Sequence, residues 1–498
     1  MPSAKTSIAK DTFIFTLASL VSQTVAFGLA IYIRNTLGPE AMGLWALLQV
    51  VLSYISYTNL GIMNAVCREV PVLRGRGVAE EEITAMKNLG YTYLSLVSFV
   101  TCAGVTVAAF LLRARISEAF FWGLLVIALM TLFERNVGYR VQILYTDKKF
   151  QLVSRFRVYS SLVNAALVMA LCWRFGLYGF YLAVLFSFVF DICYLKIKAR
   201  TVFGWSWQPR RIAGLLTFGV PLVALSFATT FFSSIDKVSI GKFLGLRELG
   251  VYTLALMAGR YVFLLPNMFQ VVLLPSTMEK FGQTSEAARI KHATLPGRIM
   301  ILYFALCLGV IWIAAPLGCK ILLPKYVGGL AAMKALIFGY AFMALSQQMG
   351  HILLGHRRHL WMLGPALVLA GLLWAASAWV VGQGGGLWHV AALMSAFQLV
   401  YYLLSSFFGL SVFYEAKKIV TTLLINVVPL GVSLMVLLAF DRFYPQDNWL
   451  SVAAKLCVYA ALWCCLVLMF EKDTGVLKLL GETWRRRWPQ GAAPETAV

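Results

Sequence analysis

Charged residues are scarce in this 498-residue chain, and acidic ones are scarcer than basic ones. Only 13% of the residues are charged, 60% are hydrophobic, and 21 Asp and Glu stand against 43 Lys and Arg. Soluble domains usually carry about 25% charged residues. The composition therefore excludes an ordinary soluble domain and indicates a membrane protein.

Several chemical motifs are also missing. The nine cysteines lie mostly inside apolar stretches and form no CxxC pair, which disfavours disulfides and metal ligation. Gly241-Lys242 is followed by Phe243 and lacks the upstream glycine of a phosphate-binding loop, so no ATP site is indicated. No DxD motif occurs. The histidines have no metal-site spacing, so we expect neither a metal nor another cofactor.

Long apolar runs dominate what is present. A helix needs about 20 mostly apolar residues to cross the hydrocarbon core. Fourteen stretches of suitable length are found, at 12–33, 43–64, 89–112, 119–145, 151–173, 176–197, 212–240, 249–275, 298–318, 329–354, 360–381, 387–412, 419–440 and 449–470. The sequence predicts an all-α integral membrane protein with about 14 transmembrane helices.

The basic residues predict the orientation of these helices. With the N-terminus inside, 28 of the 43 Lys and Arg fall in inside segments and 9 in outside loops. This is the bias of the positive-inside rule, and the even number of spans places the C-terminus inside as well. The net charge of +22 thereby serves topology, and we expect no nucleic-acid partner.

Two segments 207 residues apart match without gaps. Residues 33–47 align on residues 240–254 with five identities, among them Gly38 with Gly245 and Gly43 with Gly250. Each segment ends one apolar stretch, turns at glycine and begins the next. Spans 1 and 7 enter from the same side, so the repeat is parallel. Membrane proteins built from two related halves are usually transporters.

The repeat predicts four parts of the chain. We expect two six-helix lobes at 1–211 and 212–416, an accessory helix pair at 417–471 and a cytoplasmic tail at 472–498. In the tail, Leu477, Leu480, Trp484 and Trp488 recur at helical spacing around three arginines. This pattern fits an amphipathic helix on the inner leaflet or a frayed basic tail.

Three stretches resemble the polysaccharide transporter branch of the MOP superfamily (multidrug, oligosaccharidyl-lipid and polysaccharide flippases). They run from Asn59 to Pro71 with the turn Arg74-Gly75-Arg76-Gly77, from Phe218 to Ala255, and from Leu322 to Val327 with the helix that follows. The resemblance implies a V-shaped, alternating-access carrier of two six-helix lobes plus two accessory helices. It also implies a lipid-linked oligosaccharide cargo.

Charges inside predicted spans are the candidate site residues, because a charge in lipid costs at least about 2.5–3.5 kcal/mol. Arg260 lies near the middle of span 8, and either faces a central cavity or pairs with a distant carboxylate. Lys237 either faces the cavity or forms a local ion pair with Asp236. Asp236 is also a candidate for a coupling ion.

Span 4 carries Glu134, Arg135 and Arg140. Glu134 either binds a proton or sodium ion or forms a structural salt bridge, and Arg140 either reaches the interface or joins Arg135 at the cargo. Arg34 and Lys334 lie near outer span ends, as interfacial anchors or substrate contacts.

Two further residues stand at the start of the first inside loop. Arg68 and Glu69 belong to a stretch that carries the family resemblance. A role for them in gating or substrate entry is implied by that resemblance alone.

The leading hypothesis is a flippase in the bacterial cytoplasmic membrane. Cavity cations would hold the pyrophosphate of a polyprenyl-linked oligosaccharide, since arginine suits phosphate, and a proton or sodium gradient would supply energy. The partners expected are the lipid-linked cargo, the bilayer, the coupling ion and the polysaccharide polymerase machinery. One alternative is a multidrug/ion antiporter, which the excess of cations disfavours. The other is a polytopic glycosyltransferase or polymerase, which is disfavoured because the chain has neither a DxD motif nor a long outer loop.

Overall fold

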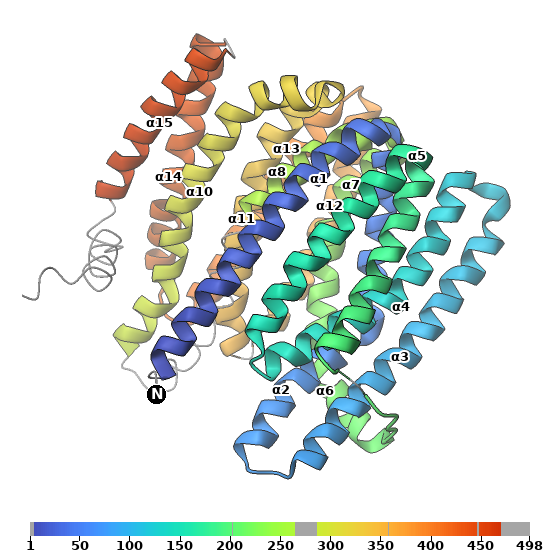
Figure 1. Cartoon of the computed structure of the whole chain (residues 1–498). Coiled ribbons are helices and arrows are strands. Elements are labelled where there is room, and N and C mark those ends of the chain that lie inside the picture. Colours follow the sequence, from blue (N-terminus) through green and yellow to red (C-terminus); the bar gives the residue numbers. More distant parts are fainter. Residues whose placement is uncertain (1–3, 202, 264–285, 357, 446–447, 470–498) are drawn as a thin grey trace, which may run out of the picture. The chain divides into compact units, whose positions relative to one another are not determined.

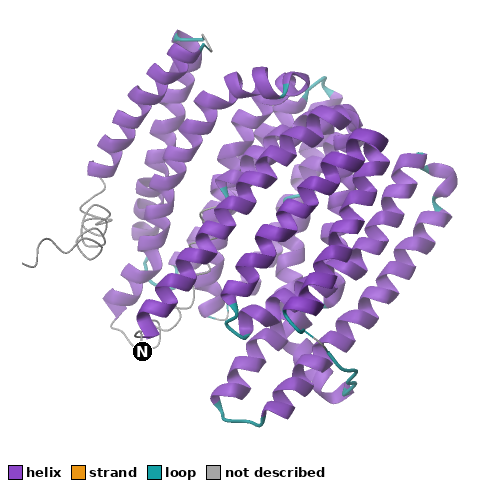
Figure 2. Cartoon of the chain, in the orientation of Figure 1, coloured by secondary structure: helices purple, strands orange, loops and turns teal. Residues whose placement is uncertain are grey.

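All regular secondary structure in the part of the chain that the structure describes is helical. The computed structural model describes residues 4–201, 203–263, 286–356, 358–445 and 448–469. Within these ranges α-helices alternate with short loops, as Figure 2 shows. Short 3-10 segments lie in some of the connections. The all-helical class predicted from the composition is confirmed.

The chain divides into two compact units, the first formed by residues 1–253 and 366–387. Its helices are α1 (Ala4–Ile55), α2 (Ile62–Gly75), α3 (Glu80–Leu111), α4 (Glu118–Thr146), α5 (Phe150–Lys198), α6 (Pro209–Phe232), α7 (Ile235–Phe243), the first part of α8 (Leu246–Val262) and most of α12 (Leu363–Gly382). In Figure 1 they run from blue to green, apart from α12, which is orange.

The second unit is formed by residues 254–365 and 388–498. It holds the end of α8 and the helices α10 (Glu286–Leu322), α11 (Leu330–Gly355), α13 (Leu387–Leu410), α14 (Ala416–Phe443) and α15 (Trp449–Met469). α10 packs against α11, α14 and α15. The Tyr459 hydroxyl on α15 donates to the Ala305 carbonyl on α10 at 2.5 Å.

Eleven helices among the described residues are long and apolar enough to cross a membrane. Two of them, α1 with 52 residues and α5 with 49, have the length of two spans each. The predicted span 8 runs into residues outside the described ranges. The chain is a multi-pass membrane protein, and the number 14 stays a prediction.

Glycine divides each of the two long helices. Gly38 has φ 76° and ψ 175°, and Gly176 has φ 56° and ψ −130°, so neither residue is helical. Backbone with positive φ is accessible to glycine at little cost. The turn predicted at a glycine of the repeat lies at Gly38 in its first segment, and Gly176 supplies a second positive-φ break between the two halves of α5.

The matched segments of the repeat meet inside the first unit. A Cβ atom on Gly43 would collide with the carbonyl of Leu246, and one on Gly250 would collide with the carbonyl of Pro39. In the repeat, Gly43 corresponds to Gly250 and Pro39 corresponds to Leu246. The contact is therefore reciprocal, as in an interface related by a two-fold axis.

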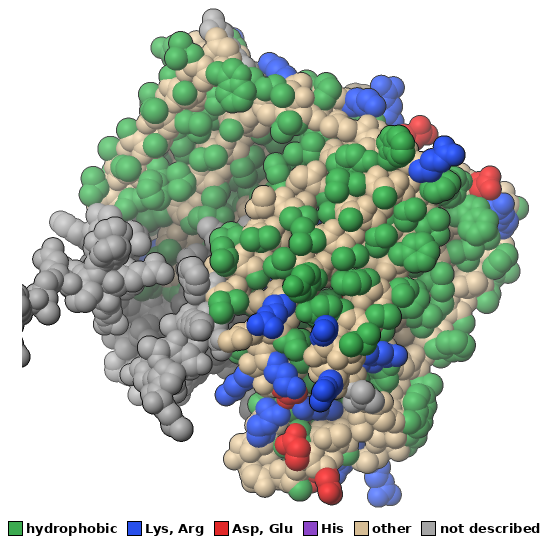
Figure 3. Space-filling view, viewed as in Figure 1, with side chains coloured by type: hydrophobic (Ala, Val, Ile, Leu, Met, Phe, Trp, Pro, Cys, Tyr) green, Lys and Arg blue, Asp and Glu red, His purple; other side chains and the backbone are tan. Residues whose placement is uncertain are grey.

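The outer surface of the first unit is apolar between the ends of its helices. Figure 3 shows hydrophobic side chains over α3, α4 and α5, with Lys and Arg gathered toward the helix ends. Phe99 and Val100 on α3 are 68% and 69% exposed, and Trp173 on α5 is 80% exposed. Such an apolar surface is what contact with lipid requires.

The predicted boundaries of the lobes, the accessory pair and the tail stay predictions. The tail at 472–498, including the expected amphipathic helix, lies outside the described residues.

The reciprocal contact predicts that two substitutions have equivalent destabilising effects. Gly43→Ala and Gly250→Ala should each destabilise the protein by about 1–3 kcal/mol, since each methyl group overpacks against backbone. Thermal unfolding of the purified protein in detergent measures the effect. Gly104→Ala on α3 is the control, because nothing lies within 4 Å of its added Cβ. Equal stability of all three variants would contradict the close contact.

Candidate functional site

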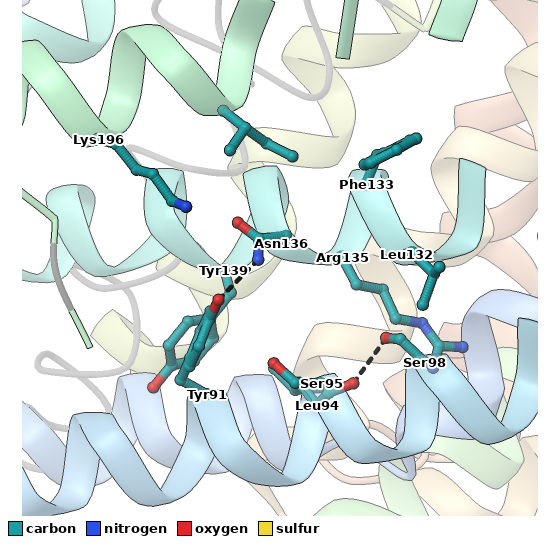
Figure 4. Close-up of a pocket in the computed structure, with 11 residues that line it drawn as sticks. Tyr91, Leu94, Ser95, Ser98, Leu132, Phe133, Arg135, Asn136, Tyr139 and Lys196 are labelled. Atoms are coloured by element: carbon teal, nitrogen blue, oxygen red, sulfur yellow. Dashed lines mark hydrogen bonds between the residues drawn. The ribbon is translucent and has the colours of Figure 1, made fainter. Parts of the chain in front are cut away.

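A cavity of about 430 Å³ with a mixed polar and apolar lining lies within the first unit, between α3, α4 and α5. Figure 4 shows its lining. The residues are Tyr91, Leu94, Ser95 and Ser98 on α3, Leu132, Phe133, Arg135, Asn136 and Tyr139 on α4, and Ile192 and Lys196 on α5. Cavities of this size hold small ligands or their head groups.

Helical periodicity explains why these residues meet. The α3 residues Tyr91, Leu94, Ser95 and Ser98 are spaced i, i+3, i+4 and i+7, and so are Leu132, Arg135, Asn136 and Tyr139 on α4. Residues at this spacing share one face of a helix. Each helix therefore turns one semi-polar stripe toward the cavity.

Two cations and no carboxylate line the cavity. Arg135 reaches it from α4 and Lys196 from α5, and Figure 4 shows both side chains extending inward. Asn136 donates to the Tyr91 hydroxyl at 2.9 Å across the same space. The positive sign suits an anionic ligand with several acceptor oxygens.

Arg135 is only partly satisfied by the protein. Its Nη2 atom donates to the Ile55 carbonyl at 2.6 Å and to the Thr58 hydroxyl. Its Nη1 atom is buried without a hydrogen-bond partner in the described chain. A buried unpaired donor is unfavourable, so this group is suited to meet a ligand.

Arg140, one turn beyond Asn136, is in contrast fully engaged. It is 2% exposed and donates to Asn136 Oδ1 at 2.7 Å and to both the carbonyl and the hydroxyl of Thr201. Its guanidinium also lies 5.3 Å from the Phe203 ring centroid. Arg140 holds the segment that leads from α5 to α6 against the first unit.

Asp236 and Lys237 form a local ion pair. Asp236 is 1% exposed, its Oδ2 accepts from the Tyr252 hydroxyl at 2.7 Å, and its Oδ1 lies 3.2 Å from Lys237 Nζ. Lys237 Nζ also donates to the Ser233 carbonyl at 2.6 Å. Of the two roles left open for Lys237, the structure therefore contains the local pair.

Arg34 and Lys334 also have protein partners. Arg34 is 8% exposed and donates to the carbonyls of Ala30 and Thr253 at 3.0 and 3.1 Å. In the second unit, Lys334 Nζ lies 2.7 Å from Asp441 Oδ2. These contacts join neighbouring helices within each unit.

Arg260, Glu134 and Arg68 have exposed side chains. Arg260, near the end of α8, shows no ion pair or hydrogen bond with any described residue. Glu134 lies on α4 beside Arg135. Arg68 on α2 lies over the Phe218 ring, with 4.3 Å between guanidinium carbon and centroid. Its neighbour Glu69 is half-buried.

A charge network closes one end of the first unit. Asp147, just after α4, accepts from Arg74 and from Lys87, each at 2.9 Å. Burial by itself would raise the pKa of the Asp147 carboxyl, but the hydrogen bonds and charges of Arg74 and Lys87 outweigh it and lower that pKa. Arg74 belongs to the glycine-basic turn that the sequence singled out.

Sequence reasoning missed Lys196 because this lysine lies at a span end, where basic residues usually serve topology. Its spacing of i+4 from Ile192 was the available signal. In the part of the chain that the structure describes, no three His, Cys, Asp or Glu side chains group as a metal site.

A family model described as "Polysaccharide biosynthesis protein" matches residues 8–279. No curated protein matches the chain.

Among solved structures, a lipid II flippase MurJ in an inward closed conformation has a TM-score of 0.67 at 14% identity, covering 93% of this chain and 99% of that one. An inward-facing multidrug resistance MATE family transporter of the MOP superfamily has a TM-score of 0.63 at 14% identity, covering 80% and 95%. Its outward-facing counterpart has a TM-score of 0.58 at 14% identity, covering 83% and 96%. The chain therefore has the MOP transporter fold.

The network at Asp147 predicts a pH-dependent stability. Since its folded-state pKa is lowered, the contribution of the ionised carboxylate is present above the usual Asp value of about 3.9 and is lost as the pH falls through the lower folded value. Asp147→Asn should lower the thermal unfolding midpoint at pH 7, and the gap to wild type should shrink below pH of about 4.

Glu82→Gln is the matched control for Asp147→Asn. The Glu82–Arg211 pair has side chains 44% and 42% exposed, and exposed pairs contribute little. A constant gap between Asp147→Asn and wild type from pH 7 to pH 4 and below would contradict the charge network.

Proposed function

Because the chain belongs to the polysaccharide biosynthesis protein family, we propose that it is a flippase for a polyprenyl-pyrophosphate-linked oligosaccharide. It moves this cargo from the inner to the outer leaflet of the bacterial cytoplasmic membrane for cell-surface polysaccharide synthesis. Its N- and C-termini are cytoplasmic. The observation that carries the proposal is the acid-free cationic cavity of the first unit.

The chemistry of the cavity supports a phosphate ligand. Pyrophosphate presents many acceptor oxygens and negative charge, and a guanidinium donates to such oxygens in pairs at fixed geometry. Arg135 has a buried donor without a protein partner, and Lys196 adds a second positive charge. The sugars lie in water and the polyprenyl chain stays in the lipid.

The predicted cavity cations separate into two groups by their contacts. Arg140, Arg34, Lys237 and Lys334 already have protein partners. We therefore assign the pyrophosphate to Arg135, and Arg260 stays a separate candidate contact for the cargo. Arg68 and Glu69 are assigned to gating or cargo entry.

An ion gradient drives the cycle of alternating access between two lobes. Asp236 and Glu134 are the candidates for binding the coupling proton or sodium ion. Asp236 already accepts from Tyr252 and Lys237, whereas the Glu134 side chain is exposed. Contact with polysaccharide polymerase machinery would hand the translocated cargo to the next step.

Multidrug/ion antiport is the second candidate, because the fold is also that of MATE transporters. A carrier of cationic drugs needs acidic groups at its ligand, and the cavity of the first unit has none in its lining. A membrane glycosyltransferase or polymerase is the third candidate. The family and the fold relatives of this chain support it least.

Loss of the gene should make cells accumulate a complete lipid-linked oligosaccharide. The cargo is finished on the inner leaflet and cannot cross, so it stays protected from reagents added outside. Mass spectrometry of extracted polyprenyl-pyrophosphate glycans measures this. A truncated oligosaccharide would point to a glycosyltransferase, and unchanged glycans would favour drug export.

Arg135→Gln should fold normally and lower translocation about tenfold or more, since a hydrogen bond to a charged group contributes about 1.5–3 kcal/mol. Arg135→Lys should retain part of the activity. Flipping of the extracted cargo in proteoliposomes is the measurement. Lys149→Gln, at an exposed lysine after α4, controls for loss of one positive charge. If Arg135→Gln had wild-type activity, Arg135 would be excluded as the main contact of the pyrophosphate. If Arg260→Ala had wild-type activity, Arg260 would be excluded as a cargo contact.

A further inference from the structure

A carboxylate outside the proposed cargo cavity is buried in the first unit and incompletely paired. Asp191 lies in the second half of α5 and is 8% exposed. Its Oδ1 atom is buried and has no hydrogen-bond partner among the described residues. The Ser160 side chain, in the first half of the same helix, lies close to the Asp191 carboxyl group.

Two pairs fix the register between the halves of α5. Ser160 meets Asp191, and the Ser187 hydroxyl donates to Asn164 Oδ1 at 3.0 Å. Ser160 and Asn164 are four residues apart in the first half, and their counterparts Asp191 and Ser187 are four residues apart in the reverse order. The halves are therefore antiparallel, with a polar seam between them.

Two hydrogen bonds place α1 beside the first half of α5. Arg157 Nη1 donates to Ser19 Oγ at 3.3 Å, and the Tyr32 hydroxyl donates to the Met169 carbonyl at 3.0 Å. The offsets of 138 and 137 residues show that the segments are parallel. The same offset brings Ser22 level with Ser160.

By this register, Ser22 is a third oxygen-bearing side chain at the level of Ser160 and Asp191. Its Oγ is buried and, like Asp191 Oδ1, has no partner in the part of the chain described. α1, the first half of α5 and its second half thus each contribute one oxygen-bearing side chain at one level. Inside a membrane such a carboxylate is costly unless it is protonated or bound to a cation.

Charged neighbours are engaged elsewhere. On α5, Arg157 bonds to Ser19 and lies over the rings of Phe15 and Tyr145. On α4, Arg140 holds Thr201 and Arg135 contacts Ile55. Further titratable side chains on α5 and on the helices packed against it include Glu134, Tyr139 and Tyr145 on α4, Tyr32, Arg34 and Glu40 on α1, and Arg155, Tyr159, Cys193, Tyr194 and Lys196 on α5. No ion pair joins any of these described groups to Asp191.

We propose that Asp191, Ser160 and Ser22 form a monovalent-cation site, occupied by a proton or a sodium ion, in the first unit. Carboxylate and hydroxyl oxygens are ligands for a hard cation, and the carboxylate alone accepts a proton. The role of this site in coupling rests on the proposed flippase function, whereas the binding of the cation does not.

The site is placed to act on the cargo cavity. Asp191 is followed by Ile192, which lines that cavity, and Lys196 lies little more than one turn further along α5. The cation site and the anion cavity thus share one stretch of helix. Neutralising Asp191 is transmitted to the cavity through the backbone of α5 itself.

Cation binding is measured on the purified full chain in lipid nanodiscs, without cargo. Thermal unfolding is followed in sodium chloride and in choline chloride at equal ionic strength from pH 5 to pH 8, together with binding of radioactive sodium. The expected result for a sodium site is a sodium-dependent stabilisation, with Asp191→Asn weakening sodium affinity at least tenfold. For a proton site, the stability changes with pH, and Asp191→Asn removes this change.

Glu415→Gln, at an exposed carboxylate before α14, is the matched control and should behave as wild type. If Asp191→Asn does not fold, the Ser22→Ala/Ser160→Ala double variant is tested in its place. We expect this variant to lose sodium affinity at least several-fold, for a sodium site, or to shift the pH dependence of stability, for a proton site. Responses to sodium and pH that are unchanged in the variants overturn the site. Failure of the flippase proposal alone would instead leave these binding results intact while cargo transport is absent.

Discussion

The absence of water from the membrane interior is the constraint on which this structure depends. Each polar group that folds into the bilayer core needs a partner within the chain, since lipid offers none. Arg140 and Asp236 satisfy this demand with several hydrogen bonds each. Arg135 Nη1 and Asp191 Oδ1 are exceptions. One is a cation suited to an anionic cargo and the other an anion suited to a small cation.

These two atoms lie on neighbouring helices, Arg135 on α4 and Asp191 on α5. α4 presents Arg135 to the cavity, and α5 presents Lys196 to that cavity and Asp191 to the seam between its own two halves. Adjacent residues of a helix point about 100° apart. The side chains of Asp191 and Ile192 therefore lie in different surroundings although they belong to the same helical turn. A single rigid element thus connects a cation site with an anion site.

The repeated glycines explain how two segments with little sequence in common pack reciprocally. At Gly43 and Gly250 each segment brings its backbone against the other, where any Cβ would collide with a carbonyl. Such a contact constrains two residues and leaves the remaining side chains free to differ.

The sequence by itself determined the all-helical membrane class, the turn at Gly38, the repeat and the family resemblance. These follow from composition and local periodicity, which lipid exposure enforces along every helix. Which charges have partners was decided only by the tertiary structure. Arg135 and Arg140 look alike in sequence, five residues apart on one helix. Thr201, 61 residues further along the chain, binds one of them and leaves the other at the cavity. Lys196 and Asp191 acquired their places in the same way, because the packing of α1, α4 and α5 sets side-chain surroundings that no local pattern encodes.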